Sequence, residues 1–220
     1  MWGAPINNVV RGAEIRRQLS DLCLIHDMSD MIPQGAGLAG VYWLFDAADI
    51  VLRHSAPDAG VRQSFLAQIL ASLQPVLRLL DLGQRGAYQL VATAAGWPVL
   101  PSSTTSQSSS AWLTLQGKTV ALYTLTDSAA RQAKSAIESL VPNVSVELSA
   151  DHVCTSRLQN LAHKADLFVV ATSSAKHAAT DCIMRHRGKA PLAYAAGRGF
   201  SSFIRAISEF LDERSRLNQA

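Results

Sequence analysis

The sequence contains little that would tie the protein to a membrane or to a nucleic-acid backbone. It has no run of about 18 apolar residues, so a membrane-spanning helix is not expected. The N-terminus lacks a basic cluster followed by an apolar segment, which argues against a secretory signal peptide. The net charge is only +3, short of the dense basic patch of a dedicated nucleic-acid binder. We therefore expect no membrane partner, and contact with nucleic acid only indirectly.

Cysteine is also scarce. Cys23, Cys154 and Cys182 are odd in number and include no CxxC pair, so neither a disulfide framework nor a zinc ribbon is expected. Cys182 and His186 are one helical turn apart, and His152 and Cys154 add two further zinc-ligating types, but this spacing fits no common zinc motif. The sequence thus predicts reduced thiols, a cytoplasmic location and no metal site.

The composition does provide a core, because 48% of the residues are apolar and 17% are charged. A chain of 220 residues forms one large domain or two small ones. Residues 101–110, PSSTTSQSSS, are almost entirely serine and threonine and offer nothing apolar to bury. We therefore predict a domain at 1–100, a linker at 101–110 and an independently folding domain at 111–220.

The first of these domains is predicted to be mostly helical. Apolar residues recur at spacings of three and four between Phe65 and Leu80, which is the pattern of an amphipathic helix. Pro75 should kink this helix or divide it. Residues 41–54 and 87–97 are two further predicted helices.

After the linker, β-rich runs alternate with helical patterns. The predicted strands are 118–125, 144–149, 166–172 and 191–196, and the predicted helices are 127–141, 155–165, 175–186 and 201–215. Four such alternations in about a hundred residues require right-handed crossovers and a parallel sheet covered on both faces. The predicted fold class is α/β, with a small four-stranded, Rossmann-like or flavodoxin-like C-terminal domain.

Ligands of such sheets bind beyond the carboxyl ends of the strands, where the winding direction reverses. Three of these strand ends are polar here, so we expect them to form one crevice. Its predicted ligand-binding residues are Thr124, Thr126, Thr172, Ser173, Ser174, Lys176, His177, Gly197, Arg198, Gly199, Ser201 and Ser202.

The chemistry of this predicted crevice favours an anion. Free N–H groups at helix N-termini carry partial positive charge, and Lys176 and Arg198 add full charges. The segment GRGFSS lacks the third glycine of a dinucleotide fingerprint, so no classical cofactor is expected and the ligand would be a nucleotide or phosphate. Hydroxyls at such corners are also common helix caps, and a lone His177 is more often a surface residue than a catalytic base.

The C-terminal hundred residues resemble the bacterial domain of unknown function DUF2325. The resemblance is carried by LQGKTVALYTL, by RLQNLAHKADLFVVATSSAKHAATDCI and by GKAPLAYAAGRGFSSFIRAI. Thr124 and Leu125 replace the glycine pair that often follows the first strand of that family. The resemblance implies a Rossmann-like or receiver-like unit and a setting in bacterial antiviral defence or mobile-element neighbourhoods.

The leading functional hypothesis is a non-enzymatic ligand-sensing or adaptor protein, with protein partners in a defence-type complex. It rests on a cationic, hydroxyl-rich crevice without an evident nucleophile and base. One alternative is an enzyme acting on a nucleotide or phosphoester, with His177 as acid or base and with Lys176 and Arg198 as charge clamps. Another is a purely structural subunit of a complex.

Overall fold

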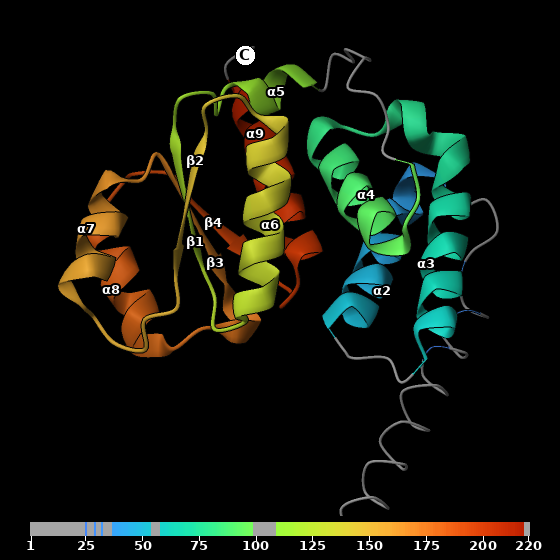
Figure 1. The fold of residues 1–220 in the computed structure, drawn as a ribbon. Coiled ribbons are helices and arrows are strands. Elements are labelled where there is room, and N and C mark those ends of the chain that lie inside the picture. The colour runs from blue at the N-terminus through green and yellow to red at the C-terminus, as the bar shows by residue number, and fades with distance from the viewer. Residues whose placement is uncertain are drawn as a thin grey trace, which may run out of the picture.

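The computed structural model describes residues 25, 29, 32, 37–53, 58–98 and 109–217. In this part of the chain a group of helices precedes a four-stranded parallel sheet, so the predicted α/β fold is confirmed (Figure 1). Residues 101–108, which form most of the predicted linker, lie outside the described residues. None of the described helices is both long and apolar enough to cross a bilayer.

The N-terminal elements are the 3₁₀ turn η1 (Leu38–Gly40), the helices α2 (Val41–Arg53), α3 (Ala59–Leu73) and α4 (Leu82–Ala95), and the 3₁₀ segment η2 (Gln74–Leu79). Pro75 divides the apolar stripe as predicted, because α3 ends two residues before it. The helix α4 begins earlier than the predicted residue 87. Its start is fixed by a reciprocal cap, in which Asp81 accepts from the Gln84 N–H and the Gln84 side chain accepts from the Asp81 N–H.

The sheet contains β1 (Thr119–Tyr123), β2 (Ser145–Ser149), β3 (Leu167–Ala171) and β4 (Leu192–Ala195), in the order β2-β1-β3-β4. All three pairings are parallel, and Leu122 is the register partner of Leu148 on one side and of Val169 on the other. The winding therefore reverses between β1 and β3. All carboxyl ends of the strands meet at one edge of the sheet, the carboxyl edge, and all amino ends meet at the opposite amino edge.

Helices cover both faces of this sheet. The helices α7 (Ser156–Lys164) and α8 (His177–Arg187) lie on one face, and α6 (Asp127–Leu140) and α9 (Phe200–Leu217) lie on the other (Figure 1). The strands alternate accordingly: Tyr123 and Phe168 face α7 and α8, whereas Leu122 and Val169 face the opposite way. The remaining described helix, α5 (Ser109–Leu113), leads into β1.

The N-terminal helices lie against α6 and α9 on the side away from the sheet (Figure 1). One apolar cluster runs from Phe45 and Tyr88 of these helices through Ile137 and Phe203 to the sheet, while α7 and α8 enclose a separate, smaller cluster. The two halves of the chain thus share their larger core. The predicted division into independently folding domains stays a prediction.

A fragment of residues 109–220 tests this division. The faces of α6 and α9 that α2 and α4 cover would become exposed, and each large apolar side chain exposed costs about 1.5–3 kcal/mol. We expect the fragment to unfold at lower denaturant concentration than the full chain and to bind an apolar dye such as ANS. Denaturation of both proteins, followed by far-UV circular dichroism, provides the measurement. Equal midpoints and no dye binding would support independent domains.

Candidate functional site

The carboxyl edge of the sheet brings together the polar corners that the sequence singles out. The Thr126 hydroxyl, after β1, lies 2.9 Å from the Ser174 hydroxyl, after β3. The Leu125 N–H donates to the Ser174 carbonyl at 2.9 Å, and the Arg198 Nε–H donates to the Ser173 carbonyl at 2.9 Å. These contacts place the three strand ends side by side, as the parallel topology predicts.

Much of this polar surface is occupied by internal hydrogen bonds. The Thr124 hydroxyl is buried and accepts from the Thr126 N–H at 3.1 Å, and the Thr172 hydroxyl donates to the Ala195 carbonyl at 3.3 Å. The Tyr123 hydroxyl donates to the Asp151 carbonyl and accepts from the Lys176 N–H. Burial raises the pKa of this tyrosine, so it stays neutral at physiological pH. These hydroxyls hold the corners together.

At the amino end of α9, a carboxylate from the N-terminal half of the chain accepts a hydrogen bond from the first residue of the helix. Asp49 on α2 is 2% exposed and accepts from the Phe200 N–H at 3.0 Å. The Arg53 Nε–H donates to its other oxygen at 2.8 Å. Burial raises the pKa of the Asp49 carboxyl, while Arg53 and the Phe200 N–H lower it by less. A Cβ atom at Gly199 would overlap this carboxylate, so glycine is needed there for close approach.

A neighbouring aspartate of α2, Asp46, is hydrogen-bonded to Ser201, the first serine of α9. Asp46 accepts from the Ser201 hydroxyl at 2.6 Å and from Arg205 Nη2 at 2.7 Å. The Ser202 hydroxyl donates to the Gly199 carbonyl at 2.7 Å. Ser201, Ser202 and Gly199 are all buried. Two of the residues predicted to bind a ligand, Ser201 and Gly199, therefore meet aspartates of the N-terminal half, whereas Ser202 bonds within the C-terminal half.

The exposed part of the predicted crevice consists of Thr172, Ser173, Lys176, His177 and Arg198. Lys176 is the residue before α8 but makes no side-chain cap. Lys176 and His177 form no ion pair with another described residue, and His177 makes no hydrogen bond with Asp181, one helical turn later. The sequence-predicted residues thus meet at one edge, where Lys176, His177 and Arg198 are exposed.

A basic cavity of about 570 Å³ lies at the opposite, amino edge of the sheet. Lys118, Asp166 and Pro191 border it just before β1, β3 and β4, respectively. Lys164 and Arg214 border it from the last turns of α7 and α9. These cations were not predicted as ligand-binding residues, because ligands of parallel sheets usually bind at the carboxyl edge. Their only sequence signal is a basic residue before a strand or at the end of a helix.

A buried arginine, Arg187, hydrogen-bonds to backbone carbonyls in the wall of the basic cavity. Arg187 donates to the carbonyls of Ala162, Ala165 and Pro191, and its guanidinium lies 5.8 Å from the Phe168 ring centroid. It therefore ties the end of α7 to the start of β4. Burial lowers the pKa of Arg187, and Asp166 acts in the opposite direction. Even so, the guanidinium stays charged here.

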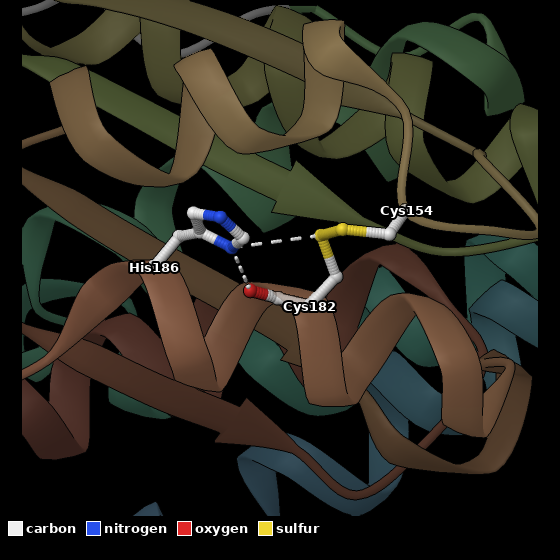
Figure 2. Close-up of side chains that lie close together, drawn as sticks. All are labelled: Cys154, Cys182 and His186. Carbon is white, nitrogen blue, oxygen red and sulfur yellow. Dashed lines mark hydrogen bonds between the residues drawn. A yellow bond between two sulfur atoms is a disulfide. The ribbon is translucent and has the colours of Figure 1, made fainter.

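A second group of reactive side chains lies between α7 and α8, where Cys154 and Cys182 form a disulfide beside His186 (Figure 2). The expectation of reduced thiols is therefore wrong for this pair. Their sequence separation of 28 residues conceals that the β2–α7 loop meets the middle of α8, with the two Cα atoms 5.4 Å apart. Cys23 lies outside the described residues.

A family model described as DpdD-like matches residues 18–206. This match runs through both halves of the chain, so the assignment is not restricted to the C-terminal hundred residues, and a DUF2325 domain is not shown. The matched family is a bacterial, defence-associated one. No curated protein and no solved structure matches the chain.

The contact between Asp49 and α9 leads to a test by substitution. Asp49→Ala leaves the buried Phe200 N–H and Arg53 without their acceptor, and we expect a loss of about 3 kcal/mol in the free energy of unfolding. Gly199→Ala should destabilise the protein comparably, because the added methyl group displaces the same carboxylate. Urea denaturation of the full chain provides the measurement.

Asp46→Ala is the matched control. Its carboxylate is 45% exposed and its partner Arg205 is 34% exposed. We expect a smaller loss, of about 1–2 kcal/mol, because the ion pair is exposed and only the Ser201 hydroxyl loses a buried acceptor. Equal effects at the two aspartates would contradict the assignment of Asp49 as the residue that joins the halves.

Proposed function

This chain belongs to the DpdD-like family, and we propose that it is a non-catalytic component of a bacterial DNA-modification or defence system that binds a nucleotide-sized anion. The family association supports the setting. The proposal of an anionic ligand rests on the basic cavity at the amino edge. In this proposal the helical half is the part that contacts protein partners, since none of its described residues lines the cavity.

The charge of the basic cavity favours an anionic guest. Lys118, Lys164 and Arg214 form no ion pair with any described residue. The one carboxylate among the described lining residues, Asp166, already accepts from the Thr119 N–H at 2.8 Å. Three unpaired cations therefore line the cavity beside one carboxylate that is already hydrogen-bonded. An arginine can bind a phosphate bidentately, and the two lysines supply point charges beside it.

The size of the basic cavity favours a small molecule over a duplex. Small-molecule sites measure about 300–1,000 Å³, and the cavity of about 570 Å³ falls within that range. Apolar surface is also present, from Leu115, Phe210 and Leu211. A phosphate group held by the cations and a base or ribose against this apolar wall would use both kinds of lining.

The carboxyl edge remains the alternative location for the anion. Lys176 and Arg198 are exposed there beside the corners of β3 and β4, as the sequence analysis expects. The enzyme hypothesis depends on His177 at the same edge. A general base needs a positioned partner, and the His177 side chain makes no hydrogen bond or ion pair with another described residue. This observation supports binding without turnover.

Isothermal titration calorimetry with ATP and with a short DNA duplex tests the proposal on the full chain. We expect ATP to bind more tightly than the duplex. The double variant K118A/R214A should bind ATP about a hundredfold more weakly, since each charged hydrogen bond to phosphate contributes about 1.5–3 kcal/mol. The ATP should be recovered unchanged.

The matched control is the double variant K176A/R198A, which also removes two exposed cations. It should bind ATP as the wild type does. The reverse pattern, with binding lost only in K176A/R198A, would place the site at the carboxyl edge and contradict the cavity. Hydrolysis of ATP that His177→Ala abolishes would establish the enzyme alternative.

A further inference from the structure

The seam between α7 and α8 gathers two cysteines and a histidine on the face of the sheet away from the N-terminal helices (Figure 2). Cys154 lies in the loop that precedes α7, whereas Cys182 and His186 lie on successive turns of α8. One ligand atom from each of the three lies within 4.8 Å of the others. Cys182 is 1% exposed, so the group is partly shielded from water.

These donor types select a particular metal. Thiolate sulfur and imidazole nitrogen are the commonest ligands of Zn²⁺ in proteins, which it binds tetrahedrally. Cys182 and His186 are four residues apart on one helix and therefore share a face. Their Sγ and Nδ1 atoms are 3.7 Å apart. A tetrahedral zinc with normal Zn–S and Zn–N bonds separates such atoms by about 3.6 Å, so this pair is already placed for a shared ion.

The surroundings add a second imidazole. The ring of His163, at the end of α7, lies edge-on to the ring of His186 with 5.2 Å between centroids. His186 Nδ1 lies 2.8 Å from the Cys182 carbonyl, to which the Nδ1–H tautomer donates. A structural disulfide requires neither histidine, whereas a zinc site requires at least one further donor.

We propose that reduced Cys154 and Cys182, together with His186, bind one Zn²⁺ ion, and that the disulfide is the metal-free, oxidised form of the same site. A dithiol reductant supplies two electrons and two protons to the Cys154–Cys182 bond and leaves as its own disulfide. Zn²⁺ then displaces one proton from each thiol, and the His186 proton moves to Nε2 so that Nδ1 can coordinate. Water or His163 completes the fourth position.

The test compares oxidised and dithiol-reduced full-length protein in a zinc titration against a chromophoric chelator. We expect one Zn²⁺ per chain in the reduced protein and none in the oxidised protein. Co²⁺ in place of Zn²⁺ should give the thiolate charge-transfer absorption and the visible bands of a tetrahedral site. Absence of stoichiometric zinc in the reduced wild type would overturn the proposal.

Three variants identify the ligands. C154S, C182S and H186A should each weaken zinc binding about a hundredfold or more, because a structural site loses much of its affinity with one ligand. H186A retains both cysteines and can still form the disulfide, so its loss of binding is not a folding defect. Far-UV circular dichroism checks this directly.

Matched controls come from the same chain. C23S removes the third cysteine, and H152A removes an exposed histidine two residues before Cys154. Both should bind zinc as the wild type does. If H186A bound zinc as tightly as the wild type, the ion would be held by the dithiol alone and the proposed site would be wrong. The H163A variant decides the fourth ligand: tetrahedral Co²⁺ bands that shift identify His163, and unchanged bands identify water.

Discussion

The burial of Asp49 at the amino end of α9 joins the two halves of this protein. A carboxylate that is 2% exposed needs polar partners, and Asp49 accepts from the Phe200 N–H at the helix end and from the guanidinium of Arg53. The absence of a side chain at Gly199 permits the approach. Because α2 is fixed to α9 in this way, the apolar faces of α2 and α4 are held against α6 and α9, and a single core extends from the helices to the sheet.

This constraint also occupies part of the edge at which parallel sheets usually bind their ligands. In a parallel sheet the helix ends at the carboxyl edge are the usual anion sites. Here the end of α9 already holds an internal anion, and the corners after β1 and β3 bond to each other through Thr126 and Ser174. The basic cavity at the amino edge keeps its cations unpaired instead. The disulfide between α7 and α8 lies on the face of the sheet opposite the N-terminal helices. His163 borders the basic cavity and also packs against His186, beside the disulfide.

Local patterns were sufficient for the sheet and for most helices. The β-branched run of β3 and its polar ending are visible in sequence, and parallel topology then brings Ser174 and Arg198 to one edge. Contacts between distant segments were not accessible in this way. Nothing near Ser201 indicates that Asp46 is its partner, and nothing near Cys154 indicates that a loop and a helix 28 residues apart will meet. The position of the basic cavity likewise depends on how α9 ends against the loops before β3 and β4.

The central claim is that an anion binds at the amino edge and leaves the carboxyl edge untouched. Amide chemical shifts of the ¹⁵N-labelled full chain, followed during titration with ATP, test it most directly. The account predicts shifts that change around Lys118, Lys164 and Arg214, with those of Thr126, Lys176 and Phe200 unchanged. Changes confined to Thr126, Lys176 and Arg198 would contradict it.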